Sequence, residues 1–367
     1  MRPSDAAGTM LTIDLGAIAS NYRTLNDQLG GVRCAAAVKA NAYGVGVAQV
    51  APVLAAAGCN DFFVATQDEA LALRSLLPEP TITVLNGADP GREAECLDHD
   101  LRPALNDLGQ IERWATLARE RGRLDAVLHL DTGMCRLGLP AYEVERLATE
   151  PERLDGLNLI LIMSHLACAD DAGHPMNQQQ RMTFDRLRQM LPSAPASLAN
   201  SSGIYLGPEF HYDLARPGVA LYGGNPTPDK PNPMAEVIRL QSKIVQVRDV
   251  DSPQTVGYGA AHRVAGPARI ATVPVGYADG YRRSLSGRAF AAIGGARVPV
   301  VGRVSMDLIS LDVSTLRPEQ TRPGTTVDLI GGPCPLDEIS ALGETIGYEL
   351  LTSLGQRYER CYIDGVS

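Results

Sequence analysis

Short apolar segments alternate with longer helix-like segments through the first two thirds of the chain, and this pattern constrains the fold most strongly. RCAAAVKA (33–40), DFFVAT (61–66) and LNLILIMSH (157–165) are three of the apolar segments, each followed by a stretch with helical spacing. Repeated pairs of this kind predict parallel βα units. Roughly eight units over about 230 residues favour a (β/α)8 barrel. The alternative is a doubly wound sheet, but no G-x-G-x-x-G motif follows the first predicted strand.

The pattern of residues changes after GGNPTPDKPNP (223–233), a segment rich in Pro and Gly that is typical of a linker. Beyond it, RIATVPVGYADG and RVPVVGRVSMDLISLDV are β-branched, partly alternating and separated by turns. This pattern predicts a mostly antiparallel β domain, with one helix over 335–347. The sequence therefore predicts two domains, a barrel formed by 1–235 and a β domain formed by 236–367.

Charge and cysteine usage narrow the class of protein. The formal net charge is −9 and aromatic residues make up 5%, so nucleic acid is an unexpected partner. Seven cysteines without a C-x-x-C spacing indicate reduced thiols. No apolar run reaches the ~18 residues that span a bilayer. We expect a cytoplasmic protein with no membrane partner. The six histidines show no metal-binding spacing, so we expect no metal.

Polar residues end several of the predicted strands. Lys39, His165, Ser201 with Asn200 before it, and Arg216 each close an apolar segment. Active sites of (β/α)8 barrels lie at the carboxyl ends of the strands, so these side chains should face one mouth. Taken singly, each also fits an ordinary strand cap, and for His165 and Ser201 that is the commoner role. Four convergent polar ends favour a common site.

Lys39 is the most informative of these residues. A lysine amine with a pKa near ~10.4 is mostly protonated at neutral pH, and burial lowers that pKa and frees the lone pair. An aldehyde such as pyridoxal phosphate (PLP) is then a natural partner. SSG (201–203) and RPGVA (216–220) offer hydroxyl and backbone N–H groups before predicted helices, which suits a phosphate. Ordinary turns explain both segments equally well, and spacing alone leaves the question open.

Nine sequence blocks resemble those of the alanine racemase family, in that family's order. They are AVKANAYGVG, DTGMCRLG, SHLACAD, ANSSG, ARPGVALYG, VGYGA, VPVGYADG, VGRVSMD and YELLTS. The resemblance covers nearly the whole chain and implies a PLP-dependent racemase with a (β/α)8 barrel followed by a β domain. It also implies a homodimer in which the β domain contributes to the active site of the other subunit.

The resemblance assigns roles to individual residues. Lys39 and Tyr258, the latter supplied by the other subunit, correspond to the catalytic pair. Arg136 and the backbone N–H of Met306 correspond to groups that hold the substrate carboxylate. The entrance corresponds to Asp170 and Tyr277. The cofactor-binding set corresponds to Lys39, Tyr43, His165, Ser201, Arg216, Gly218, Val219 and Tyr348.

Elementary chemistry gives reasons for two of these roles. Racemisation removes a proton from one face of a carbon and returns one to the other, so groups such as Lys39 and Tyr258 must lie on opposite faces. A tyrosine with a pKa near ~10 needs nearby positive charge to act as a base, and a single tyrosine is more commonly a half-buried strand residue. Arg216 stays protonated and only donates hydrogen bonds. It therefore leaves the pyridine ring a weaker electron sink, which favours clean proton exchange over side reactions such as transamination.

One position departs from the family pattern. Seven residues before the carboxylate-binding arginine the family often has a lysine modified to a carbamate, and this chain has His129. Histidine is not expected to form that stable carbamate. We therefore expect Arg136 to be oriented by an anion or a neighbouring side chain, and the protein to act without the modification.

The interpretation that we favour is interconversion of L- and D-alanine, supplying D-alanine for peptidoglycan if the source is bacterial. One alternative is a related racemase for serine or a broader range of amino acids, which pocket volume would decide. Another is a non-catalytic PLP-binding protein of the single-barrel type. Proteins of that type lack a β domain, so residues 236–367 argue against it.

Overall fold

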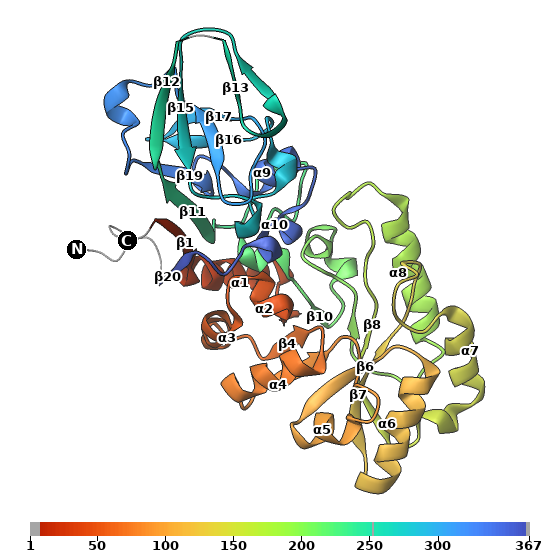
Figure 1. The fold of residues 1–367 in the computed structure, drawn as a ribbon. Helices are drawn as coiled ribbons and strands as arrows, with labels where there is room; N and C mark the ends of the chain where they lie inside the picture. Colours follow the sequence, from red (N-terminus) through yellow and green to blue (C-terminus); the bar gives the residue numbers. More distant parts are fainter. Residues whose placement is uncertain (1–7, 252, 365–367) are drawn as a thin grey trace. The chain divides into compact units, whose positions relative to one another are not determined.

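The computed structural model describes residues 8–251 and 253–364, which divide into two compact units. The barrel unit comprises Ile18–Leu221 and Asn225–Met234, and the β unit comprises the other described residues. Figure 1 shows the two units in one ribbon, with the elements labelled.

Parallel strands of the barrel unit form a closed ring. Strands β3 to β9 make a seven-stranded parallel sheet in chain order, and β10 pairs in parallel with β2. The amide of Asp213 donates to the carbonyl of Ala196 at 3.0 Å, which joins β10 to β9. The expected (β/α)8 barrel is thereby confirmed. The strands are β2 (Arg33–Cys34), β3 (Ala36–Ala37), β4 (Asp61–Val64), β5 (Thr81–Val84), β6 (Leu101–Leu105), β7 (Leu124–His129), β8 (Leu157–Met163), β9 (Ala196–Ser197) and β10 (Leu214–Ala215).

Apolar side chains of different sizes fill the barrel interior. They come from alternate positions along the strands. These residues are Ala35, Phe63, Ala104, Val127, Leu161, Met163 and Leu214, and all of them are buried. A packed interior leaves the polar strand ends as the place where the barrel can bind a ligand.

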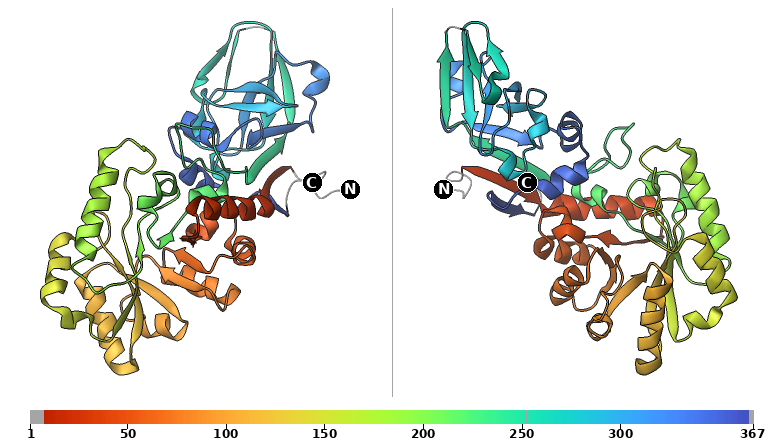
Figure 2. Two further views of the ribbon diagram at one scale, coloured as in Figure 1. Left: turned by 180° about the vertical axis from the view of Figure 1, so that it is seen from behind. Right: turned by 45° about the vertical axis from the view of Figure 1, so that its right-hand side comes forward.

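Helices lie outside the barrel strands, as the yellow and green helices in both views of Figure 2 show. Thr66 and Asp107 cap two of them by accepting backbone N–H groups. The helices are α1 (Leu15–Leu29), α2 (Lys39–Tyr43), α3 (Val47–Ala56), α4 (Gln67–Leu76), α5 (Glu93–Asp98), α6 (Leu108–Arg121), α7 (Ala141–Thr149) and α8 (Pro175–Arg188).

Only short 3₁₀ helices follow the last two barrel strands, where the sequence predicted longer helices. They are η3 (Gly203–Tyr205), η4 (Pro208–Phe210) and η5 (Val219–Tyr222), and a further one, η2 (Pro151–Leu154), precedes β8. Gly207 adopts a φ of 138°, and Pro208 lacks a backbone N–H, so an α-helix cannot run through this segment.

The β unit is built on a nine-stranded sheet in the order β12-β15-β18-β17-β16-β19-β11-β1-β20. Its pairings are antiparallel apart from β1 with β20, which confirms the mostly antiparallel second domain. The strands are β1 (Thr9–Asp14), β11 (Ile238–Lys243), β12 (Gln246–Val250), β15 (Ala268–Val273), β16 (Phe290–Ile293), β17 (Ala296–Val301), β18 (Ile309–Asp312), β19 (Thr326–Ile330) and β20 (Glu359–Ile363).

The first strand of the chain belongs to this sheet and not to the barrel. Leu11 and Ile13 alternate with partly exposed residues along β1 and are fully buried. Leu11 lies opposite Leu240 of β11 and opposite Arg360 of β20. Strand β1 therefore lies between β11 and β20, two strands from the C-terminal part of the chain.

Loops and two helices complete the β unit. A separate hairpin joins β13 (Gln254–Val256) to β14 (His262–Val264) through η6 (Tyr258–Ala260). The single helix expected near the end of the chain is two helices, because α9 ends at the cap residue Gly343 and a new helix begins at Gly347. These helices are α9 (Leu336–Leu342) and α10 (Gly347–Ser353), and the 3₁₀ helices are η7 (Tyr277–Asp279), η8 (Arg283–Leu285) and η9 (Pro318–Gln320).

Within residues 8–251 and 253–364, the helices are all too short or too polar to cross a lipid bilayer. All seven cysteines are free thiols.

Candidate active site

Lys39 begins α2 with one residue, the cap residue Val38, between it and the end of β3, and the turn that follows it is left-handed. Ala40, Asn41, Ala42 and Tyr43 have φ values of 53° to 54°. This conformation costs non-glycine residues about 1–2 kcal/mol each, so the surrounding structure must enforce it. Strain of this kind concentrates at functional sites, and here it is located immediately beside the lysine.

Glu69 holds the left-handed turn in place. One carboxylate oxygen accepts the amide of Ala40 at 2.7 Å, and the other accepts the amide of Ala65 at 2.8 Å. Sequence reasoning did not single out Glu69. The T-x-x-E pattern from Thr66 to Glu69 signals a capping box, and its glutamate sits where α4 begins.

The Lys39 amine is in an environment that favours its neutral form. Burial lowers the pKa of the amine, the Arg136 guanidinium lowers it further, and Glu69 opposes both effects. A lysine with a lowered pKa has a larger fraction of free amine at neutral pH, which is the form that attacks a carbonyl carbon or accepts a proton.

Arg216 directly follows β10 and is a buried cation. Its guanidinium donates to the hydroxyl oxygen of Ser197 and to the carbonyl of Ser164, the latter at 2.5 Å. Its Cζ lies 5.8 Å from the ring centre of Phe63. Burial lowers the pKa of Arg216 to about 10, so the group stays charged at neutral pH. No carboxylate of the described chain forms an ion pair with it.

Tyr43, Ser201 and Gly218 come together at the same end of the barrel. The hydroxyl oxygen of Ser201 accepts the amides of Gly218 at 2.9 Å and Ala220 at 3.3 Å. A Cβ atom on Gly218 would overlap the hydroxyl of Tyr43, so glycine is what allows the phenol to reach this point. Val219 follows in η5. Hydroxyl donors beside backbone N–H groups form an arrangement suited to an anion such as a phosphate.

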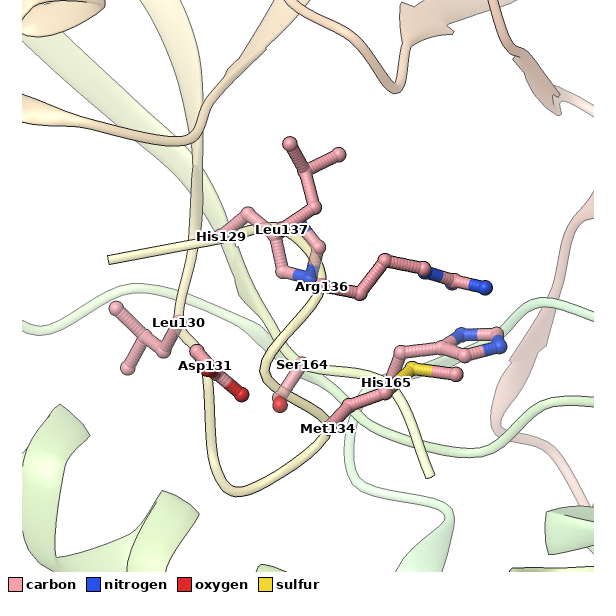
Figure 3. A pocket seen from close by; sticks show the side chains of 8 residues that line it. All are labelled: His129, Leu130, Asp131, Met134, Arg136, Leu137, Ser164 and His165. Carbon is pink, nitrogen blue, oxygen red and sulfur yellow. The ribbon is translucent and has the colours of Figure 1, made fainter. Parts of the chain in front are cut away.

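The loop after β7 carries Arg136. The carboxylate of Asp131 accepts the amides of Gly133 at 2.9 Å and Cys135 at 3.1 Å. The amide of Leu139 donates back to the carbonyl of His129 at 2.8 Å. These bonds fold the loop over a small hollow. Figure 3 shows the residues that line it, which are His129, Leu130, Asp131, Met134, Arg136, Leu137, Ser164 and His165.

Two histidines of this hollow are held neutral. Burial, followed by the charges of Arg216 and Arg136, lowers the pKa of His129 to about 3. The pKa of His165 is lowered well below its ordinary value, first by burial and then by Arg216. Nδ1 of His129 lies 2.8 Å from Oδ1 of Asn106, a buried residue that sequence reasoning missed because nothing in β6 or its surroundings marks it.

Three other predicted site residues lie in neighbouring loops of the β unit. The amides of Tyr277 and Ala278 donate to the carbonyls of Ser305 and Met306, both at 3.0 Å. Tyr258 is carried by η6, and a Cβ atom on Gly302 would lie 2.8 Å from the carbonyl oxygen of Val256, two residues before it. The side chains of Tyr258, Tyr277 and Met306 are exposed by 71%, 43% and 53%. All three residues therefore present uncovered surface.

The last two predicted site residues lie in a helix of the β unit and in a loop of the barrel unit. Tyr348 lies in α10 of the β unit and is 38% exposed. Asp170 is exposed in the loop between β8 and α8 of the barrel unit.

The strand ends of the closed barrel carry a partly buried amine, a buried arginine, and hydroxyl and amide groups suited to an anion. Together with the β unit, these features are typical of a barrel enzyme. Two family models match the chain. The model of the alanine racemase N-terminal domain covers residues 13–226, and that of the alanine racemase C-terminal domain covers residues 237–362. The chain belongs to the alanine racemase family.

Individual relatives agree with this assignment over nearly their full lengths. A catabolic alanine racemase of Mesorhizobium japonicum is 51% identical, with 98% of this chain and 94% of the relative covered. An alanine racemase of Rhodospirillum rubrum is 50% identical, with 99% and 98% covered.

Solved structures show the same fold. Alanine racemase from Bartonella henselae, crystallised with covalently bound pyridoxal phosphate, has a TM-score of 0.94 at 41% identity, covering 97% of this chain and 100% of that one. The biosynthetic alanine racemase from Pseudomonas aeruginosa has a TM-score of 0.91 at 34% identity, covering 97% and 99%.

Proposed function

We propose that this protein interconverts L-alanine and D-alanine with pyridoxal phosphate as its cofactor. The observation that carries the proposal is the Lys39 amine, whose pKa burial lowers, at the same barrel mouth as a buried arginine without a carboxylate partner. The chemistry that PLP supplies when bound is an electron-withdrawing ring that weakens the α C–H bond of an amino acid.

The residues at the barrel mouth fit a phosphorylated aldehyde. Lys39 offers the amine, and the hydroxyls of Tyr43 and Ser201 with the backbone near Gly218 and Val219 offer a place for the phosphate. Arg216 would hold the pyridine nitrogen by donating a hydrogen bond to it, and that nitrogen would stay unprotonated because arginine keeps its own proton. His165 lies beside it as a neutral ring. The resemblance to the family assigns a further phenol of the phosphate site to Tyr348, which lies in α10.

Two groups move the α-proton in this proposal. The free Nζ of Lys39 takes or returns a proton on one face of the substrate carbon, and Oη of the other subunit's Tyr258 does so on the opposite face. Arg136 and the backbone N–H of Met306 hold the substrate carboxylate, which fixes the carbon between the two bases. Asp170 and Tyr277 line the route into the site.

A homodimer supports this arrangement, with the β unit of one subunit completing the site of the other. The exposure of Tyr258, Tyr277 and Met306 supports the homodimer, because a subunit interface would cover large side chains that are open in the single chain. Light scattering on the purified protein tests the proposal, which predicts twice the mass of one chain. A chain that racemises alanine as a monomer would contradict it.

The physiological role that we propose is supply of D-alanine for peptidoglycan in the cytoplasm of a bacterium. The seven free thiols support a reducing compartment. Deleting the gene should make growth depend on added D-alanine. Growth without D-alanine, in a strain lacking other alanine racemases, would contradict this role.

The activity itself is tested by chiral chromatography of L-alanine after incubation with the PLP-loaded protein. The expected result is a mixture that approaches equal amounts of both enantiomers. L-Serine and larger amino acids, assayed in parallel, show whether the protein is instead a racemase of broader range. L-Alanine that stays unchanged in a yellow, PLP-loaded preparation would overturn the proposal and favour a non-catalytic PLP-binding protein.

A further inference from the structure

The hydrogen-bond partners of Asn106 fix the proton position on His129. The side-chain amide nitrogen of Asn106 donates to the carbonyls of Leu85 at 3.0 Å and Ala104 at 2.8 Å. Both partners only accept hydrogen bonds, so the nitrogen and oxygen of this amide cannot be exchanged. Its Oδ1 therefore faces His129, and the proton of the imidazole must reside on Nδ1. The other ring nitrogen, Nε2, carries a free lone pair.

The Asn106 side chain is held by a second layer of contacts. Gln110 accepts the backbone amide of Asn106 through Oε1 at 2.8 Å, and its own amide nitrogen donates to the carbonyl of Asn86 at 3.0 Å. A Cβ atom on Gly87 would lie 2.6 Å from that Oε1, so glycine leaves the space that Gln110 occupies. The tautomer of His129 is thus set by a network built into the ends of β5 and β6.

His129 shares its hollow with Arg136, as Figure 3 shows. The imidazole is buried at the end of β7, and Arg136 extends across the hollow from the following loop. Asp131, a carboxylate of the same hollow, accepts two backbone amides of the loop. Within the part of the chain that the structure describes, Arg136 forms no ion pair, so its charge is not neutralised by the protein.

We propose that His129 is a positioning residue whose Nε2 accepts a hydrogen bond from one water molecule that the Arg136 guanidinium also binds, since the two side chains share the hollow but form no direct hydrogen bond in the structure. This inference rests on the proposed role of Arg136 in holding the substrate carboxylate. A neutral acceptor orients the guanidinium but forms no ion pair with it. The positive charge of Arg136 can then pair with the substrate carboxylate. The protein then needs no added carboxyl group, and its activity should not change when carbon dioxide and bicarbonate are removed.

The first test observes the tautomer in the PLP-loaded wild-type protein. Long-range ¹H–¹⁵N correlation spectra of protein labelled at histidine distinguish a proton on Nδ1 from one on Nε2. The His129 signals are assigned by their loss in His129→Gln. The expected result at pH 7.5 is a neutral ring with its proton on Nδ1. A proton on Nε2, or on both nitrogens, would overturn the proposal whatever the activity of the protein.

The second test measures binding of propionate, which has a carboxylate but no amine. His129→Leu in the PLP-loaded protein should weaken propionate binding about 10-fold and raise KM for alanine more than it lowers kcat, because one water-mediated hydrogen bond to Arg136 is lost. His129→Gln, whose amide oxygen also accepts, should recover most of the binding. His99→Gln is the matched control, because His99 is an exposed histidine at the C-terminal cap of α5, away from His129 in the sequence. Equal binding to wild type and His129→Leu would contradict the inference.

Arg136→Leu distinguishes a failure of the inference about His129 from a failure of the proposed role of Arg136. If it abolishes propionate binding while His129→Leu leaves binding unchanged, the inference about His129 fails and the role of Arg136 stands. If Arg136→Leu binds propionate like the wild type, the proposed role of Arg136 fails first. Should His129→Leu not fold, His129→Gln and the wild-type tautomer decide the question.

Discussion

The hydroxyl of Tyr43 occupies the space that a Cβ atom on Gly218 would take. Gly218 also donates its amide to Ser201, so one glycine joins the phenol and the hydroxyl of the proposed phosphate site. Gly218→Ala should therefore displace Tyr43 and weaken PLP binding to the apoprotein by about 10-fold or more, the value of one or two hydrogen bonds. Fluorescence titration with PLP measures the change.

Gly266→Ala is the control for this variant, because nothing lies within 4 Å of a Cβ atom there. It should bind PLP like the wild type. Unchanged PLP affinity in Gly218→Ala would mean that Tyr43 does not contribute to the cofactor site.

Glu69 controls both the turn after Lys39 and the charge of its amine. Glu69→Gln leaves one acceptor oxygen where two carboxylate oxygens now accept three amides, so the free energy of unfolding should fall by about 1 kcal/mol. Removing the negative charge also lowers the pKa of Lys39 further, because Glu69 is the group that raises it. The pH dependence of PLP uptake by the apoprotein should therefore shift to lower pH. Glu145→Gln, on the exposed side of α7, should change neither property, and a shift to higher pH in Glu69→Gln would refute the electrostatic role.

Tyr258→Phe tests the assignment of the two faces. Loss of the phenol should slow proton removal from L-alanine by about 100-fold or more, the usual contribution of a general base. Proton removal from D-alanine, assigned to Lys39, should slow less. Exchange of the α-proton in D₂O, followed separately for each enantiomer, measures both steps, and equal slowing would contradict the assigned faces.

Co-expression of Lys39→Ala and Tyr258→Phe chains tests whether the phenol comes from the other subunit. Each variant alone should be nearly inactive. Mixed dimers would contain one intact site if Tyr258 acts in the partner, so activity should return to about one quarter of the wild-type value. If Tyr258 acts within its own chain, no mixed dimer contains an intact site and activity should stay at the level of the single variants.

The neutral state of His129 makes stability depend on pH in a predictable direction. Its pKa falls from about 6.5 when unfolded to about 3 when folded. Between those values the unfolded chain binds a proton that the folded chain does not, so stability falls as pH decreases from about 6.5 towards 3. His129→Gln should remove roughly 1–2 kcal/mol of the loss seen between pH 7.5 and pH 5. Urea unfolding at the two pH values measures it, and an unchanged pH dependence would show that His129 is already charged when folded.

The polar residues at the barrel strand ends could be predicted from the sequence, because each of them follows the end of an apolar segment. Lys39, His165 and Arg216 directly follow or lie within two residues of a strand, so the alternation that predicts the barrel also marks them. The position of β1 in the second sheet could not be predicted in this way. TMLTID has an ordinary strand pattern, and nothing in it specifies pairing with β11 and β20, more than two hundred residues away.

Supporting residues are harder to predict than the groups they support. Asn106 matters because it lies beside His129 in space, although the two are 23 residues apart. The left-handed turn from Ala40 to Tyr43 contains no glycine, and the amide of Ala40 within it donates to Glu69 from another βα unit. Such contacts depend on which strands become neighbours, and a single sequence carries that information only through the fold.

Reduction with borohydride followed by peptide mapping tests the central claim most directly. The chain has only three lysines, Lys39, Lys230 and Lys243, so the site of modification can be read without ambiguity. Treatment of the PLP-loaded protein should bleach its yellow colour and add one phosphopyridoxyl group to the peptide that contains Lys39. Modification at Lys230 or Lys243 with Lys39 left unmodified, or no modification at all, would contradict the account.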